Sequence, residues 1–274
     1  MKISILGCGW LGTPLAESLL EQGHSVKGST TTPDKLGTLR EKGIDPYLIE
    51  LDPELYCDSC EAFWDADLLI LNIPPGRGKE DVVEYHTSQI RSVIPPLENS
   101  PIDHLIFISS TSVYPDRSGI MDESDAVAGK AGRPSGEALL TTESLLMQSN
   151  AFETTVLRFG GLYGHGRHPV HHLAGREGLD NAKAPVNLIH RDDCIAIIEE
   201  VIDRQIGGEV FNAVSDGHPP RSQFYKAAAE EFGLEPPKFR ERNGTDGKVV
   251  SNNKLKRVLG YRFKYPNPMN FQAP

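Results

Sequence analysis

The chain has 274 residues, of which 28 are basic and 38 acidic, so its formal net charge is −10. This charge argues against a nucleic-acid-binding protein with a broad basic surface, because contact with phosphates needs an excess of Lys and Arg. The hydrophobic fraction of 38% is enough to form a core, which argues against disorder. The apolar runs are all far shorter than the ~20 residues that span a bilayer, so no membrane contact is expected.

The N-terminal apolar run stops at Gly7, which is too short for the apolar core of a secretory signal and predicts a cytoplasmic protein. Four cysteines are too few for a disulfide scaffold. Cys57 and Cys60 match the C-x-x-C pattern, but the sequence has no second such pair at metal-ligand spacing. We therefore favour incidental cysteines in a loop or helix start over a redox or metal role.

The first half of the chain alternates short apolar strands with helical stretches. The strand predicted at 67–72 contains the continuous apolar run 68–71, as expected when both faces of a strand are buried. The helix at 81–98 is expected to end at or before Pro95 and Pro96, because proline interrupts helical hydrogen bonds. The remaining predicted strands are 2–6, 24–28, 46–50 and 104–109, and the remaining helices are 11–22 and 34–42. This alternation predicts βαβ units and a parallel sheet.

The second half is less regular, and no linker divides it from the first. A segment rich in Gly, His and Pro at 160–185 predicts an irregular lobe. Helices are predicted at 136–149, 192–204, 222–232 and 252–259, and strands at 154–158 and 209–213. The fold class is therefore α/β, with a Rossmann-like doubly wound parallel sheet and a small C-terminal substrate lobe.

The glycine pattern G-x-G-x-x-G at residues 7–12 follows the first predicted strand and opens the first predicted helix. This context predicts a dinucleotide site. Gly7 permits the tight turn, Gly9 lets the backbone approach a pyrophosphate, and Gly12 lets the helix pack against the strand. Trp10 and Leu11 complete the loop, and the helix N-terminus supplies N–H groups and a positive dipole end for the phosphates.

The end of the second strand separates NAD from NADP, because an acid there binds the ribose 2′-hydroxyl and repels a 2′-phosphate. This sequence has hydroxyl residues before any acid. Ser29, Thr30, Thr31 and Lys35 are candidates to hold a phosphate, whereas Asp34 starts the next helix. We favour NADP(H), with NAD(H) as the alternative. Simple capping of that helix by the same residues is the structural alternative.

Several blocks of the sequence follow one another in an order that resembles the extended short-chain dehydrogenase/reductase family, which includes the nucleotide-sugar epimerases and dehydratases. The blocks are the glycine loop at 7–12, S-S-T-S-V-Y at 109–114, L-R-F-G-G-L-Y-G at 157–164, V-N-L-I-H-R-D-D at 186–193, G-E-V-F-N at 208–212 and K-L-K-R-V-L-G at 254–260. Together they span nearly the whole chain. The glycine loop departs from the family, in which most extended members have G-x-x-G-x-x-G.

The resemblance implies a nicotinamide coenzyme bound by residues 1–158, while residues 159–274 complete the sheet and form the substrate lobe of one continuous unit. Ser110 takes the place of the family's catalytic Ser or Thr, next to the nicotinamide. Coenzyme contacts are also expected from Ile73, Pro74, Ser109, Phe159, Gly160 and Gly161. Substrate contacts are expected from Ser112, Tyr114, Asn187 and His190, and a homodimer is possible because the family often dimerises.

The family's chemistry needs Tyr-x-x-x-Lys on the helix after residue 133, where the lysine lowers the tyrosine pKa and the tyrosine moves the proton. Aligning Glu143 with the glutamate that usually follows the lysine places Ser135 at the tyrosine position and Leu139 at the lysine position. A serine does not replace a phenol, and a leucine supplies no charge. The chain therefore resembles an atypical member of the family.

Other groups could supply the proton, and Tyr114, Tyr163 and His190 are candidates. The histidines at 165, 168, 171 and 172 have spacing that suggests a metal, but no Glu or Cys stands at motif spacing beside them, so no metal is expected.

The favoured hypothesis is an NADP-dependent oxidoreductase or epimerase that acts on a polar, nucleotide-sugar-like substrate with a rearranged proton donor. The alternative is a non-catalytic sensor of NADP(H).

Overall fold

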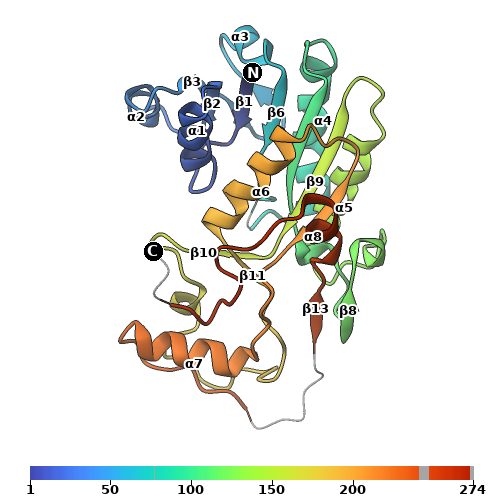
Figure 1. Cartoon of the computed structure of the whole chain (residues 1–274). Coiled ribbons are helices and arrows are strands. Elements are labelled where there is room, and N and C mark those ends of the chain that lie inside the picture. The colour runs from blue at the N-terminus through green and yellow to red at the C-terminus, as the bar shows by residue number, and fades with distance from the viewer. Residues whose placement is uncertain (77, 241–246, 272–274) are drawn as a thin grey trace. The chain divides into compact units, whose positions relative to one another are not determined.

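The computed structural model describes residues 1–76, 78–240 and 247–271 (Figure 1). These residues form two compact units. Unit 1 comprises Met1–Ser109, Arg133–Leu157 and Ile198–Val210, and unit 2 comprises Ser110–Gly132, Arg158–Ile197 and Phe211–Pro274. The predicted division at residue 158 stays a prediction.

A seven-stranded sheet has the order β12-β9-β7-β6-β1-β2-β3. Its strands are β1 (Lys2–Leu6), β2 (Ser25–Thr30), β3 (Asp45–Leu48), β6 (Leu68–Leu71), β7 (His104–Ser110), β9 (Glu153–Phe159) and β12 (Val210–Ala213). β1 pairs in parallel with both β2 and β6, so the strand order reverses at β1, as in a doubly wound sheet. The predicted fold class is confirmed (Figure 1).

The helices follow the sequence prediction to within a few residues at each end. They are α1 (Gly12–Glu21), α2 (Lys35–Glu41), α3 (Glu61–Trp64), α4 (Val82–Glu98), α5 (Pro134–Met147), α6 (Arg191–Asp203), α7 (Arg221–Glu231) and α8 (Asn253–Leu259). The α3 helix was not predicted, because four residues are too short to show a helical period. None of the helices in the described ranges has the length and apolarity needed to cross a membrane.

Several short elements also lie outside the sequence prediction. They are β4 (Glu50–Leu51), β5 (Leu55–Tyr56), β8 (Gly119–Met121), β10 (Gly161–Tyr163), β11 (Leu188–His190), β13 (Lys248–Val250) and the 3₁₀ turns η1 (Thr111–Val113), η2 (Glu123–Asp125) and η3 (Pro169–His172). Strands of two or three residues show no alternation of their own, and they form only because a partner strand lies beside them. The segment at 160–185 is thus less irregular than predicted, since it contains β10 and η3.

The end of α4 corrects one prediction. The helix does not stop before Pro95 but continues through both prolines to Glu98. Proline removes one hydrogen bond at each position, but its fixed φ suits a helix. Val93 and Leu97, both fully buried, hold the last turn in place. Packing of this face therefore outweighs the lost backbone bonds.

The turn from β1 to α1 is packed against backbone on two sides. Gly7 has a φ of +112°, and a Cβ there would lie 2.5 Å from the carbonyl oxygen of Asn72. A Cβ at Gly12 would lie 2.2 Å from the carbonyl oxygen of Gly7. The Asn72 side chain also donates to Gly7 O at 3.0 Å. Both glycines are therefore required by the fold.

Replacing Gly12 with alanine should lower the free energy of unfolding by at least about 2 kcal/mol, because backbone atoms cannot move aside as a flexible side chain can. Urea unfolding followed by circular dichroism measures this difference. The matched control is Gly37→Ala in α2, where a Cβ would meet no described atom within 4 Å. That variant should be neutral or more stable by about 0.5–1 kcal/mol, and equal losses in the two variants would contradict the packing argument.

A buried histidine lies in the core of unit 2. His168 is 9% exposed, and its ring packs against Phe224 and Phe232 with centroid distances of 5.4 and 4.8 Å. Its Nδ1 accepts a hydrogen bond from the N–H of Val170 at 3.2 Å. Burial, followed by the charge of His171, lowers the pKa of His168 from 6.5 to about 4. The folded protein therefore holds this imidazole neutral.

This shift predicts a loss of stability in acid. Below about pH 6.5 the unfolded chain binds a proton at His168, whereas the folded chain resists until about pH 4. The stabilisation is complete above pH 6.5 and falls by about 3 kcal/mol as the pH drops to about 4, at about 1.36 kcal/mol per pH unit.

Urea unfolding at several pH values measures this slope. His168→Asn keeps an acceptor for Val170 and should flatten the slope relative to the wild type. His86 and His218 also have pKa values lowered by burial, so the comparison with the variant isolates His168. A variant with the wild-type slope would contradict the assignment.

Candidate functional site

A cavity of about 350 Å³ lies beside the glycine turn in unit 1. Its lining comes from the turn, the first turn of α1 and the start of α2, and consists of Cys8, Gly9, Trp10, Thr13, Lys35, Thr38 and Leu39. Lys35 is the charged residue in this lining. The cavity therefore suits a ligand that carries negative charge.

The N-terminus of α1 opens at the same turn. This ten-residue helix has no side-chain cap at Leu11 and no acidic residue in its first turn. Its first N–H groups and the positive end of its dipole favour an anion such as a phosphate. A Cβ at Gly9 would meet no described atom within 4 Å, so packing does not explain this glycine.

The hydroxyl residues at the end of β2 divide into two groups. Ser29 is buried, and its Oγ accepts a hydrogen bond from the Gly7 N–H at 2.9 Å. Thr30 is also buried, and its Oγ1 accepts from the Thr32 N–H at 3.1 Å. The Ser29 side chain therefore stabilises the turn at Gly7, and the Thr30 side chain stabilises the backbone before α2. Thr31 is exposed. Asp34 is the N-cap residue of α2, as predicted, and lies outside the cavity lining.

Some residues of the site were missed by the sequence analysis. Asn72 fixes the Gly7 turn, and its signal was a polar residue directly after the buried β6. Thr13 donates from Oγ1 to the carbonyl of Cys8 at 3.1 Å. Thr38 lines the cavity one helical turn after Lys35. The sequence could not predict this, because it does not tell which face of α2 is turned toward the cavity. Of the predicted pair after β6, Ile73 lies beside Gly7, and Pro74 is exposed.

A buried polar pair connects β7 to α5. Ser109 Oγ donates to the Glu143 carboxylate at 2.5 Å, and both residues are almost fully buried. Ser135, two helical turns before Glu143, is half-buried, and Leu139, one turn before Glu143, is 3% exposed. This stretch of α5 therefore offers a hydroxyl and an apolar side chain rather than a phenol and an ammonium group.

In unit 2, Ser110 is the N-cap of η1. Its Oγ accepts a hydrogen bond from the N–H of Ser112 at 3.2 Å. That bond uses an oxygen lone pair and leaves the hydroxyl proton for another acceptor. Both serines are half-buried.

The structure also brings together three residues that the sequence predicted separately. The N–H of Gly161 donates to the carbonyl of Asn187 at 2.8 Å, and a Cβ at Gly160 would lie 2.8 Å from the same oxygen. The Asn187 side chain bonds the backbone of Lys248 and Val250. Asn187 therefore has a structural role in joining three segments of unit 2, and its contact with a substrate stays a prediction.

Tyr114 is fully buried, together with Phe159. The Tyr114 hydroxyl donates to Asn212 Oδ1 at 2.6 Å and accepts from Arg158 at 3.0 Å. Burial is the main cause that raises the pKa of Tyr114 to about 12. Tyr163 is shifted in the same direction, again mainly by burial. A proton-transfer role for either tyrosine has no support from this environment.

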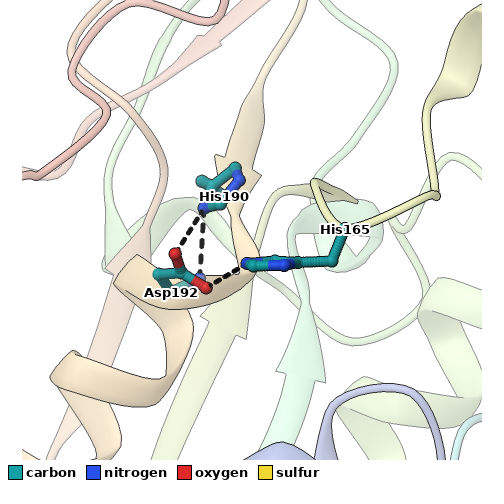
Figure 2. A group of neighbouring side chains, drawn as sticks. All are labelled: His165, His190 and Asp192. Atoms are coloured by element: carbon teal, nitrogen blue, oxygen red, sulfur yellow. Dashed lines mark hydrogen bonds and ion pairs between the residues drawn. The ribbon is translucent and has the colours of Figure 1, made fainter. Parts of the chain in front are cut away.

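His190 is fully buried at the end of β11 and belongs to a cluster with His165 and Asp192 (Figure 2). Its Nδ1 accepts from the Asp192 N–H at 3.2 Å at the start of α6. His165 Nε2 donates to Asp192 Oδ1 at 2.6 Å. The cluster lies entirely within unit 2.

The model of the family described as NADP oxidoreductase, coenzyme F420-dependent, matches residues 2–95, which contain the glycine turn and the cavity. Among solved structures, a protein of Methylobacillus flagellatus assigned to the NAD-dependent epimerases/dehydratases is 26% identical, with a TM-score of 0.71 over 97% of this chain and 94% of its own. MoeE5, solved with UDP-glucuronic acid and NAD, is 17% identical, with a TM-score of 0.77 over 99% and 97%.

Protein YeeZ of Escherichia coli K12 is 37% identical over 274 residues, which cover 98% of this chain and 97% of YeeZ. Identity at this level over both whole chains shows common ancestry. The chain belongs to the family of protein YeeZ, and it has an NAD(P)-binding Rossmann fold similar to that of the NAD-dependent epimerases/dehydratases.

Proposed function

We propose that this protein is an NADP(H)-dependent oxidoreductase or epimerase. The observation that carries the proposal is Gly9, which lines the cavity and has open space where its Cβ would be. Gly7 and Gly12 are explained by packing, but Gly9 is explained by the approach of a ligand to the backbone. The uncapped start of α1 beside it suits the pyrophosphate of a dinucleotide.

The preference for NADP rests on Lys35. This side chain lines the cavity, whereas Asp34 does not, and so the lining offers a positive charge that would favour a 2′-phosphate. Thr38 supplies a further hydroxyl in the same lining. The matching family model carries NADP in its description, which agrees with this assignment.

When bound, the nicotinamide supplies hydride transfer. Among the protein's own residues, Ser110 is the candidate for orienting the substrate, because its hydroxyl proton is not used in the bond from Ser112. The Ser110 O–H would donate a hydrogen bond to the oxygen of the reacting carbon. Ser135 and Leu139 do not supply the usual phenol and ammonium pair, so the proton exchanged with that oxygen comes from water or from another side chain.

The proposed substrate is polar and resembles a nucleotide sugar. This class is supported by solved structures of the same fold, one of which contains UDP-glucuronic acid together with NAD. A non-catalytic sensor of NADP(H) is the second candidate, and the observation that favours it is the apolar, buried Leu139 at the lysine position.

Calorimetric titration tests the coenzyme site. NADPH should bind the wild type more tightly than NADH. Gly9→Val should abolish binding of both, because its side chain fills the space needed by the pyrophosphate. The stability of this variant should change little, since the Gly9 position meets no described atom. Failure of the wild type to bind either coenzyme would contradict the proposal.

Lys35→Ala tests the preference between coenzymes. Its affinity for NADPH should fall roughly 10–100-fold, because a hydrogen bond to a charged group contributes about 1.5–3 kcal/mol. Its affinity for NADH should change by less than about threefold. The control is Lys226→Ala, which makes the same change of charge at an exposed site in unit 2. Equal losses for both coenzymes would contradict the role of Lys35.

Turnover distinguishes the enzyme from the sensor. With any carbonyl or nucleotide-sugar substrate that the wild type converts, Ser110→Ala should lower kcat about 100-fold or more, because one hydrogen bond to the reacting oxygen is lost. NADPH affinity should stay unchanged. Ser118→Ala, an exposed serine in unit 2, is the control and should keep wild-type activity. Tight NADPH binding without turnover on a broad panel would favour the sensor.

A further inference from the structure

Three side chains of unit 2 with metal-ligating atoms point toward one another (Figure 2). His165 lies in the loop after β10, His190 ends β11, and Asp192 lies in the first turn of α6. Their ligand atoms all lie within 4.8 Å of one another. The segments are brought together by the parallel pairing of β10 with β11, in which Tyr163 is opposite His190.

The separations match a tetrahedral metal ion. Metal–ligand bonds of about 2.0–2.1 Å place the ligand atoms of a tetrahedral zinc site about 3.3 Å apart. The observed separations are 2.6 Å from His165 Nε2 to Asp192 Oδ1 and 3.7 Å from His190 Nδ1 to Asp192 Oδ2. These two values, which involve different oxygens of Asp192, lie on either side of the ideal one, and all three ligand atoms lie within 4.8 Å of one another, so side-chain shifts would bring them to ligation distance. We propose that His165, His190 and Asp192 bind a divalent transition-metal ion, with zinc as the best fit.

The His190 and His165 ring nitrogens that face the cluster can supply lone pairs to a metal ion once the ion replaces their present hydrogen bonds. His190 Nδ1 accepts a hydrogen bond from the Asp192 N–H, so this nitrogen carries no proton. An ion at Nδ1 replaces that hydrogen bond, which at 3.2 Å is at the long end of the normal range. The ion also replaces the proton that His165 Nε2 donates to Asp192, and that proton is released to solvent.

The surrounding side chains already hold two of the ligands in position. The Tyr265 ring packs on the His190 ring with a centroid distance of 3.8 Å, and the Tyr163 ring meets it edge-on at 5.1 Å. Tyr265 also donates from its hydroxyl to Asp192 Oδ2 at 3.4 Å. A Cβ at position 164 would lie 2.2 Å from His190 Nε2, so Gly164 is needed there. Such outer contacts orient metal ligands before the ion binds.

The exposure of the ligands leaves a path for the ion. The His190 side chain is fully buried, but 31% of the His165 side chain and 27% of the Asp192 side chain are exposed. The ion would contact the buried His190 on one side and face solvent on the other, where a coordination position is left for water. Two imidazoles and one carboxylate favour zinc over magnesium or calcium, which prefer oxygen ligands alone.

The proposal is tested by zinc titration of the full chain after removal of metal with EDTA and dialysis. Isothermal titration calorimetry should show one zinc ion per chain with a micromolar or lower Kd. Cobalt(II) in place of zinc should give the visible absorption of a tetrahedral site.

His165→Gly removes one ligand and suits the backbone at this position, where φ is +48°. It should weaken zinc binding about 100-fold or more, since loss of even an outer partner costs 10–100-fold. Asp192→Asn should weaken it in the same way. The matched control is His172→Ala, an exposed histidine of the same unit outside the cluster, which should bind zinc as the wild type does.

Thermal unfolding gives a second readout that does not depend on activity. Zinc should raise the Tm of the wild type and of His172→Ala but not that of His165→Gly. The proposal is overturned if the wild type binds zinc no tighter than millimolar. It is also overturned if His165→Gly keeps wild-type affinity, because the zinc would then bind elsewhere, as at the Cys57–Cys60 pair in unit 1.

Discussion

The close approach of three backbone segments at the end of β1 is the constraint on which the coenzyme half of the molecule depends. Gly7, Gly12 and the carbonyl of Asn72 are so near one another that a Cβ on either glycine would collide with backbone. This packing fixes where α1 begins and leaves its N-terminus without a side-chain cap beside the cavity. In the same turn, a Cβ at Gly9 would meet no described atom, so Gly9 leaves its backbone open beside the cavity.

The β7–α5 region combines a buried polar pair with an apolar side chain one helical turn earlier. Ser109 and Glu143 form a buried pair that fastens β7 to α5. One turn before Glu143, Leu139 is 3% exposed, and an ammonium group buried at this position would lose its hydration. An apolar leucine therefore suits this buried position.

In unit 2, most of the conspicuous polar residues stabilise the fold. Tyr114 and Asn187 have all their described polar contacts inside the unit, to side chains and backbone of other segments. The cluster of His165, His190 and Asp192 differs, because two of its three side chains reach solvent. Solvent therefore reaches two of the three side chains of the proposed metal site.

Sequence alone determined the sheet, the main helices and the glycine turn. Continuous apolar runs such as β6 and glycines at fixed spacing are local signals, and they reflect local backbone and burial requirements. Tertiary structure decided the rest. The continuation of α4 past Pro95 depends on the packing of Val93 and Leu97. The meeting of His165 with Asp192, 27 residues apart, depends on the pairing of β10 with β11. No local pattern encodes such contacts, because their energy comes from segments that the chain brings together only on folding.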